Sequence, residues 1–310
     1  MKMSDKIYIF GHKNPDTDSI CSSLIKERFN RKKGYTKCFA ARLGNVNKET
    51  QFVLDYLKIE APELIEKVED GQEVILVDHN DFGQSVDGIE NASIIGVIDH
   101  HRIANFRTAE PLYYTAKPYG CTCTILYKEY VQNGLEISKE EAILMASAII
   151  SDTLLLKSPT TTNHDRRALE ELEKIAGIDI KEYGLEMLKA GTDLDDFSEE
   201  ELINLDAKSL EKDGQKFIIA QVNTVSIDDV LKRQDKIEEA ISKEIESKGL
   251  GLFVFAITDI LNSNSEAIVL GNKANVVEKA FDKKLENNRI FLEGVVSRKK
   301  QLLPVIDKNF

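Results

Sequence analysis

Residues 73–101 read EVILVDHNDFGQSVDGIENASIIGVIDHH, and this segment is the most informative about the fold. It contains two short apolar runs, Glu73–Val77 and Ser93–Ile98, and each run is followed directly by aspartate and histidine. Continuous apolar runs of this length are typical of strands that are buried on both faces of a parallel sheet. The carboxyl ends of such strands meet at one edge, where ligands bind, so we expect the Asp-His pairs to lie there together.

The rest of the first half alternates between strand and helix patterns. A further strand is predicted at Lys6–Phe10, and Ser138 with Glu141 three residues later forms a capping-box pattern that starts a helix. The predicted helices are Asp18–Phe29, Cys121–Gln132, Lys139–Ser151, Asp165–Ala176 and Ile180–Leu188. Alternating strands and helices predict an α/β domain with a mostly parallel sheet that is flanked by helices.

The sequence changes character near Ala190, where the acidic stretch AGTDLDDFSEEE begins. We predict a first domain over 1–189, a linker over 190–196 and a smaller α/β domain over 197–310. The elements predicted in the second domain are a helix from Ser198, the helices Ile227–Lys248 and Val276–Leu285, and the strands Lys216–Val222, Leu252–Thr258, Ala267–Leu270 and Ile290–Val296.

Composition restricts the class of protein. The net charge of −12 argues against a broad nucleic-acid surface, which would be basic. No apolar run approaches the roughly 20 residues that span a bilayer, and the N-terminal residues lack a signal-peptide pattern, so we expect a cytoplasmic protein without a membrane partner. The four cysteines are too few for a disulfide framework, and we expect reduced thiols.

Histidine gives the sharpest functional signal. His12, His79, His100 and His101 each follow an apolar strand and stand beside aspartates. A polar turn in which Asp18 caps the next helix would explain His12, Asp16 and Asp18 about as well as a metal site, and Asp78-His79 could be a simple strand exit. The pair His100-His101 is harder to explain structurally. Adjacent residues at an extended strand end point to opposite sides, so we expect one to bind metal and the other to face the substrate.

Asp152 adds a carboxylate at the end of the apolar segment AILMASAIISDT (142–153), where burial would be costly without a partner or a cation. Carboxylate and imidazole ligands without thiolate favour manganese, magnesium, iron or cobalt over structural zinc. These ligands are too many for one ion that keeps positions open for water and substrate. Two ions that share aspartates fit better, and such sites are common in attack on phosphorus.

A basic cluster near the end of the chain, Ser297-Arg298-Lys299-Lys300-Gln301, is unusual in so acidic a protein. Such a run is often a solvated loop, but here apolar segments on both sides would fix its position. Arginine and lysine are suited to phosphate oxygens. We therefore expect the second domain to bring Arg298 and Lys299 over the metals, with the active site in the cleft between the domains.

The motifs GHKNPDTDSI (11–20), VDHN (77–80), IDHHR (98–102), SDT (151–153) and SRKKQ (297–301) occur in the order found in one family. The chain resembles the manganese-dependent (family II) inorganic pyrophosphatases of the DHH phosphoesterase superfamily. The resemblance implies hydrolysis of pyrophosphate to two orthophosphates, with a water or hydroxide between two metal ions as nucleophile. It also implies Mn²⁺ or Co²⁺ at two tight sites, Mg²⁺ that arrives with the substrate, and a homodimer formed through the N-terminal domain.

The same resemblance assigns roles to individual residues. His12 and Asp16 would bind one ion, Asp18 and His100 the other, and Asp78 and Asp152 would bridge them. His101 would protonate the leaving group. Phosphate oxygens would be bound by Lys208, Arg298 and Lys299, and Lys208 is chosen on the resemblance alone.

Two other functions compete with pyrophosphate hydrolysis. One is a DHH-type phosphodiesterase of short oligonucleotides or cyclic dinucleotides, which would carry a GGGH-type motif that this sequence lacks. The other is a non-catalytic regulator that binds metal or nucleotide on the same fold. Such a protein would be expected to have lost a ligand or the outward histidine, whereas every matched position is filled here.

Overall fold

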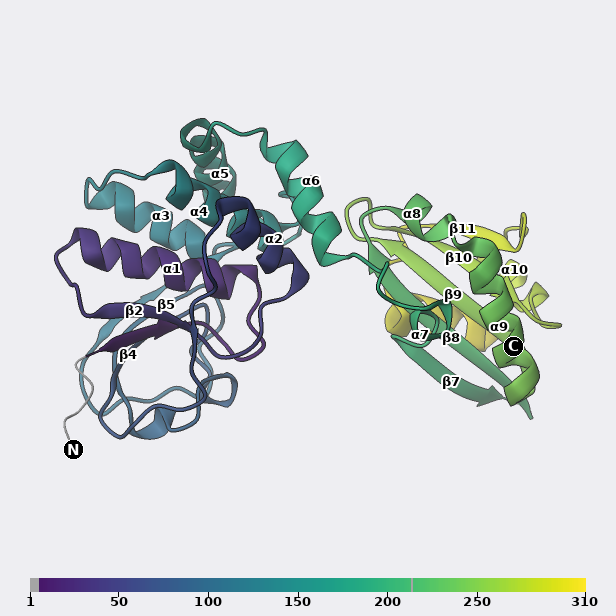
Figure 1. Ribbon diagram of the computed structural model, residues 1–310. Helices are drawn as coiled ribbons and strands as arrows, with labels where there is room; N and C mark the ends of the chain where they lie inside the picture. Colours follow the sequence, from purple (N-terminus) through teal and green to yellow (C-terminus); the bar gives the residue numbers. More distant parts are fainter. Residues whose placement is uncertain (1–5, 213) are drawn as a thin grey trace. The chain divides into compact units, whose positions relative to one another are not determined.

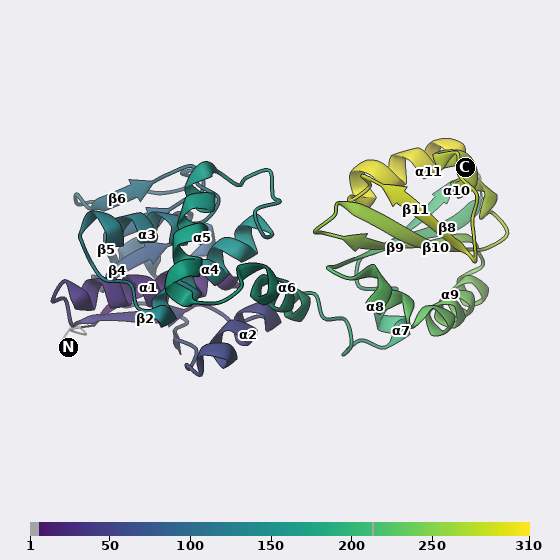
Figure 2. The same cartoon turned by 90° about the horizontal axis from the view of Figure 1, so that it is seen from above.

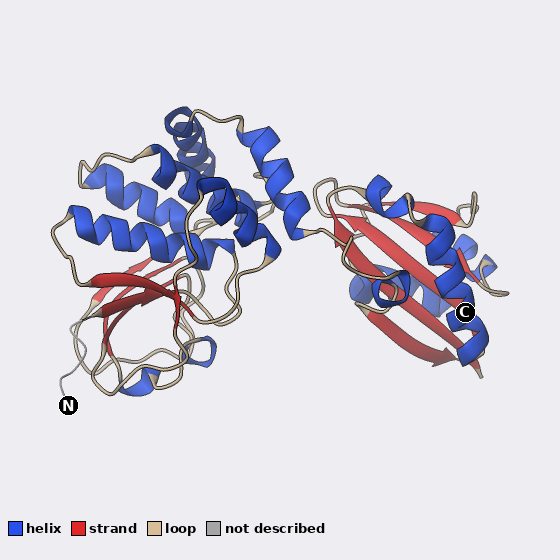
Figure 3. Cartoon of the chain, viewed as in Figure 1, coloured by secondary structure: helices blue, strands red, loops and turns tan. Residues whose placement is uncertain are grey.

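The computed structural model describes residues 6–212 and 214–310. The chain divides into two compact units, Met1–Gly191 and Thr192–Phe310, which are called the N-terminal and the C-terminal unit (Figure 1). Each unit contains one sheet with its own helices (Figure 3). Among the described residues, no helix is both long and apolar enough to cross a lipid bilayer. All four cysteines are buried free thiols.

The N-terminal unit is built on a six-stranded sheet with the order β3-β2-β1-β4-β5-β6, in which every pair of neighbours is parallel. This confirms the predicted α/β class with a parallel sheet. The strands are β1 (Ile7–Phe10), β2 (Cys38–Arg42), β3 (Glu63–Leu64), β4 (Glu73–Val77), β5 (Ser93–Asp99) and β6 (Tyr113–Ala116). The helices are α1 (Thr17–Lys32), α2 (Lys48–Leu57), α3 (Thr122–Gln132), α4 (Lys139–Thr153), α5 (Asn163–Ala176) and α6 (Ile180–Gly191).

The two faces of this sheet are covered differently. Helices α1, α3 and α4 lie on one face (Figure 1), and the capping box predicted from Ser138 and Glu141 starts α4. Loop residues such as Val68, Val86 and Ile89 pack on the other face against Val74 and Leu76 of β4. Because β4 and β5 are buried on both faces, their side chains form continuous apolar runs and their carboxyl ends open on a shared edge.

The C-terminal unit contains a mixed five-stranded sheet with the order β11-β10-β9-β8-β7, in which only β8 and β9 run parallel. Helices α7, α8 and α9 lie on one face, and α10 and α11 on the other (Figure 2). The strands are β7 (Ala207–Lys212), β8 (Gln215–Thr224), β9 (Leu250–Asp259), β10 (Asn264–Leu270) and β11 (Arg289–Glu293). The helices are α7 (Glu199–Leu202), α8 (Ile227–Leu231), α9 (Gln234–Lys248), α10 (Asn275–Phe281), a π-helical turn η3 (Arg298–Leu302) and α11 (Leu303–Asn309).

The predicted helix Ile227–Lys248 is wrong, because the structure breaks it into α8 and α9. Arg233 lies at the break, where its guanidinium donates to the carbonyls of Leu194 and Phe197 and pairs with Glu199. These contacts tie the break to the segment before α7. Hydrophobic periodicity continues across it, so the pattern alone does not reveal the interruption.

Candidate metal centre

The predicted ligands lie together at the carboxyl edge of the N-terminal sheet. They follow three strands or occupy the ends of two helices. His12 follows β1, Asp78 follows β4 and His100 follows β5, while Asp16 and Asp18 start α1 and Asp152 lies near the end of α4. Three groups have ligand atoms within 4.8 Å of one another: His12, Asp16 and Asp78; Asp18, Asp78, His100 and Asp152; and Asp78, His100 and His101. Asp78 belongs to all three groups.

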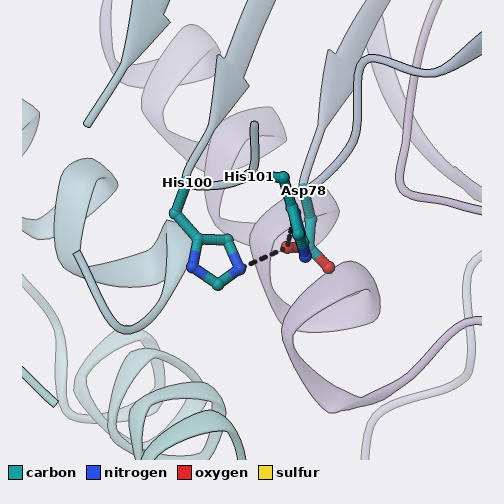
Figure 4. A group of neighbouring side chains, drawn as sticks. All are labelled: Asp78, His100 and His101. Atoms are coloured by element: carbon teal, nitrogen blue, oxygen red, sulfur yellow. Dashed lines mark ion pairs between the residues drawn. The ribbon is translucent and has the colours of Figure 1, made fainter. Parts of the chain in front are cut away.

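Asp78 is the centre of the cluster. Its Oδ2 lies 3.5 Å from His12 Nε2, and its Oδ1 lies 3.3 Å from His100 Nε2 (Figure 4). Hydroxyls of Ser19 and Thr122 donate to the two oxygens, at 2.9 and 3.1 Å. Burial would raise the pKa of Asp78, but the bonds to His100 and His12 outweigh burial and hold that pKa well below its ordinary value. Its backbone has φ 58°, a conformation that is rare outside glycine and is found at functional sites.

The two candidate histidine ligands are held in the same way. His12 Nδ1 lies 2.8 Å from the Lys13 carbonyl oxygen, and His100 Nδ1 lies 3.1 Å from the Tyr119 carbonyl oxygen. A carbonyl only accepts, so each Nδ1 carries a hydrogen and each Nε2 faces the carboxylates. This is the arrangement in which histidine binds metals in proteins. Burial lowers both pKa values, but carboxylate partners raise the pKa of His12 to about 11 and that of His100 to about 9.

Asp18 and Asp152 are the carboxylates of the cluster whose buried negative charges are least compensated. Asp18 accepts the amides of Thr122 and Cys123 at the start of α3, and burial together with the charge of Asp78 raises its pKa to about 6. Asp152 Oδ2 is buried and accepts no hydrogen bond from the described residues. Burial, then the charges of Asp18 and Asp78, raise the pKa of Asp152 well above its ordinary value. A divalent cation would satisfy this oxygen and offset the repulsion, so the residues fit a metal centre.

The expectation that His100 and His101 point to opposite sides is wrong. The strand ends at Asp99 and the chain bends, so the two rings meet edge to face with centroids 4.2 Å apart (Figure 4). The two residues nevertheless differ in exposure, since the side chain of His100 is 16% exposed and that of His101 is 51% exposed. His101 Nδ1 is held by Asp99 Oδ1 at 2.9 Å and lies 3.8 Å from Asp78 Oδ1.

The other two histidines do not join the cluster. His79 is buried, and its ring nitrogens bond to the Val77 carbonyl and the Ser85 hydroxyl at 3.0 and 3.1 Å. The ring of His164 is half-buried against Tyr119, and its Nδ1 lies 2.8 Å from Lys128 Nζ.

Sequence reasoning missed the residues that support the cluster. Asp165 is fully buried at the start of α5 and accepts the amide of Gly120 at 2.9 Å. It thereby fixes the peptide group between Tyr119 and Gly120, and the carbonyl of that group orients His100. No local pattern reveals this contact. Asp165 forms an ordinary capping box with Thr162, and that role alone explains an aspartate at this position.

The three basic residues predicted to bind phosphate belong to the C-terminal unit. Arg298 and Lys299 line a pocket of about 390 Å³ with Asp206, Gln221 and Asn223. Arg298 is paired there with Asp206, through Nη2 at 2.6 Å and Nε at 3.2 Å. Lys208 is exposed on the edge strand β7, two residues beyond Asp206, and does not line that pocket.

Comparison with known proteins adds two family matches and a set of close relatives. Residues 6–149 match the DHH family N-terminal domain, and residues 185–309 match the DHHA2 domain. The chain is 56% identical over 303 residues to a manganese-dependent inorganic pyrophosphatase of Bacillus subtilis (strain 168), which covers 97% of this chain and 98% of the relative. It is 54% identical over 306 residues to a probable manganese-dependent inorganic pyrophosphatase of Oceanobacillus iheyensis, covering 98% and 99%.

Two solved structures share the fold. A crystal structure from Methanococcus jannaschii that is described as a "putative family II inorganic pyrophosphatase" is 42% identical, with a TM-score of 0.62 and coverage of 98% of this chain and 99% of that one. An exopolyphosphatase-related protein of Bacteroides fragilis has a TM-score of 0.50 at 16% identity, covers 98% of this chain and 91% of that one, and shows the fold alone.

Proposed function

This chain belongs to the manganese-dependent inorganic pyrophosphatases, and we propose that it hydrolyses pyrophosphate to two orthophosphate ions. The observation that carries the proposal is the cluster around Asp78, in which three groups of carboxylates and imidazoles share one aspartate. Two divalent ions with a shared carboxylate are suited to attack on phosphorus. The relatives that share more than half of this sequence are named for that activity.

The proposed ligands form two sets. His12 and Asp16 would hold one ion, Asp18 and His100 would hold the other, and Asp78 and Asp152 would bind both. The Nε2 atoms that face carboxylates, and the buried oxygen of Asp152 without a hydrogen bond, support these assignments. Mn²⁺ is the proposed occupant of both sites, with Co²⁺ as a substitute, and Mg²⁺ accompanies the substrate. Such ions lower the pKa of a water that they share and turn it into a nucleophile at neutral pH.

The remaining groups act on the substrate. His101 has an exposed ring, and Asp99 raises its pKa by accepting its Nδ1 hydrogen, which favours the protonated form that a leaving phosphate requires. Arg298, Lys299 and Lys208 bind phosphate oxygens and stabilise the charge on the transferred group.

The proposal also covers the oligomeric state, the cellular location and the partners of the enzyme. The resemblance implies a homodimer formed through the N-terminal unit, and composition favours a cytoplasmic location without a nucleic-acid partner. Sedimentation velocity of the full chain tests the dimer. Salt-dependent retention on an oligonucleotide column tests whether the chain binds nucleic acid.

The direct experiment compares phosphate release from pyrophosphate with hydrolysis of a linear and a cyclic dinucleotide, using the full chain loaded with Mn²⁺ in the presence of Mg²⁺. We expect the chain to hydrolyse pyrophosphate and neither of the dinucleotides. Turnover of a dinucleotide without pyrophosphate hydrolysis would place the chain among the DHH phosphodiesterases. Bound metal without turnover of any of these compounds would indicate a regulator.

A further inference from the structure

Three polar side chains interrupt the apolar face of the C-terminal sheet that lies under η3 and α11. Phe217 and Ile219 of β8, Leu252, Val254 and Ala256 of β9, and Ala267 and Val269 of β10 form this face. The next positions in the same alternation are Gln221, Thr258 and Ser265. Thr258 and Ser265 are paired across the strands and at most 1% exposed, and Gln221 is 9% exposed. Buried polar groups are costly unless they are hydrogen-bonded, so this row requires a reason.

The three side chains form one chain of hydrogen bonds. Gln221 Nε2 lies 2.7 Å from Thr258 Oγ1, Thr258 Oγ1 lies 2.8 Å from Ser265 Oγ, and Ser265 Oγ donates to the Val295 carbonyl at 2.7 Å. Since a carbonyl only accepts, the direction of every bond is fixed. Ser265 gives its hydrogen to Val295, Thr258 gives its hydrogen to Ser265, and Thr258 accepts from Gln221.

The chain ends on the backbone of the segment that leads into the basic cluster. Gln221 Nε2 also donates to the Val296 carbonyl at 3.0 Å, and Gln221 Oε1 accepts the Arg298 amide at 2.7 Å. From the other side, Gln301 Oε1 accepts the amides of Val296 and Ser297. Interior side chains therefore bind the backbone of this segment on both sides of Ser297.

From these contacts we infer that Gln221, Thr258 and Ser265 are positioning residues for substrate binding, because they fix the backbone from which Arg298 and Lys299 extend. The inference rests on the proposed function, in which these two cations hold phosphate oxygens. Arg298 extends from this anchored backbone into the pocket, where Asp206 pairs with its guanidinium. An arginine fork recognises phosphate only in a narrow range of orientations, so a shift of its backbone weakens binding.

Thr258→Val is the sharpest test, since it keeps the shape of the side chain and removes the hydroxyl. It leaves one Gln221 hydrogen without an acceptor in a buried position. We expect the KM for magnesium pyrophosphate to rise about tenfold with little change in kcat, because binding common to substrate and transition state is lost. Thr258→Ser keeps the hydroxyl and should restore the KM.

Thr224→Val is the matched control. Thr224 is a buried threonine at the end of β8, but its hydroxyl bonds only within its own turn, to the amide and carbonyl of Ser226. We expect this variant to lose thermal stability while its KM is unchanged. Hydrogen exchange of the full chain supplies a readout without turnover: segment 294–302 should exchange faster in Thr258→Val than in Thr224→Val.

The outcomes separate the inference from the proposed function. A wild-type chain that does not turn over pyrophosphate overturns the function before any variant is compared. If the wild type is active and Thr258→Val keeps its KM and the exchange of segment 294–302, the row is only a structural feature and the inference is wrong. Failure of Thr258→Ser to restore the KM would also overturn it.

Discussion

Asp99 Oδ1 accepts hydrogen bonds from both the backbone amide and the ring Nδ1 of His101, at 3.0 and 2.9 Å. The carboxylate is fully buried and also accepts from Asn80, so it cannot swing away with the ring. The ring is held in one orientation and one tautomer, with Nε2 directed away from Asp99. This pairing separates His101 from His100, whose Nδ1 is bound by a backbone carbonyl and whose Nε2 faces carboxylates.

Replacement of His101 by glutamine should slow turnover about 10²- to 10⁴-fold, which is the usual contribution of a general acid. Both Mn²⁺ ions should remain bound, because the proposed ligand sets do not include this ring. Metal analysis of the dialysed variant beside its kcat is the measurement. Loss of one ion, with kcat rescued by excess Mn²⁺, would show that His101 is a ligand and not the acid.

The pH profile should change when Asp99 is replaced by asparagine. The hydrogen bond to Asp99 raises the pKa of His101 above its ordinary value, with burial acting in the opposite direction. An acid works while it is protonated, so a lower pKa ends the active range at a lower pH. We expect the alkaline limb of the kcat profile to move to lower pH in Asp99→Asn. An unchanged alkaline limb, in a variant whose Tm shows that it is folded, would mean that another group donates the proton.

Where the fold follows from short-range pattern, sequence alone predicts it well. The apolar run Glu73–Val77 is β4 as predicted, and the run from Ser93 extends by one residue to Asp99. The strands β2, β3, β6 and β7 and the helix α2 were not predicted. Of these, β6 and β7 (YYTA and AKSLEK) are exposed edge strands without a buried face to impose alternation. Lys208 lies on one of these strands, which is why only the resemblance could single it out.

The candidate site follows the same rule. Its ligands stand in local motifs beside strand ends, so their types and spacing are visible in the sequence. Their supports come from distant segments: the amide of Thr122 reaches Asp18 across 104 residues. The relative orientation of the His100 and His101 rings was predicted wrongly, because it depends on a backbone bend that the identity of these two residues does not indicate.

Asp165→Asn should weaken one metal site and spare the other. It replaces an oxygen that accepts from Gly120 or Thr124 with a donor, and so loosens the peptide that holds the Tyr119 carbonyl against His100. Losing a group that orients a metal ligand costs about 10- to 100-fold in affinity. Calorimetric titration of the metal-free chain with Mn²⁺ should therefore resolve one weakened and one unchanged site.

Glu141→Gln is the control for that experiment, because Glu141 is also a buried capping-box carboxylate, at the start of α4. It bonds to Lys32 and Tyr130, away from the cluster. Both variants should lower Tm, and only Asp165→Asn should lower the affinity for Mn²⁺. Equal affinities of the two variants for Mn²⁺ would show that Asp165 acts only as a helix cap.

Metal binding should release protons and strengthen as the pH rises. In the metal-free chain, carboxylate partners raise the pKa of His100 to about 9 and that of His12 to about 11, so both rings are protonated at pH 7. A metal ligand must be deprotonated, and each proton displaced adds about tenfold in affinity per pH unit. Raised histidine pKa values also stabilise the metal-free fold below their unfolded value, and this contribution is lost as the pH rises through 9. We therefore expect the Tm of the metal-free chain to fall as the pH rises from about 6.5 through 9, the pKa of His100, while the Mn²⁺-loaded chain keeps its Tm. Titration with Mn²⁺ in two buffers of different ionisation enthalpy measures the protons released, and a titration without proton release would contradict the protonated state of both rings.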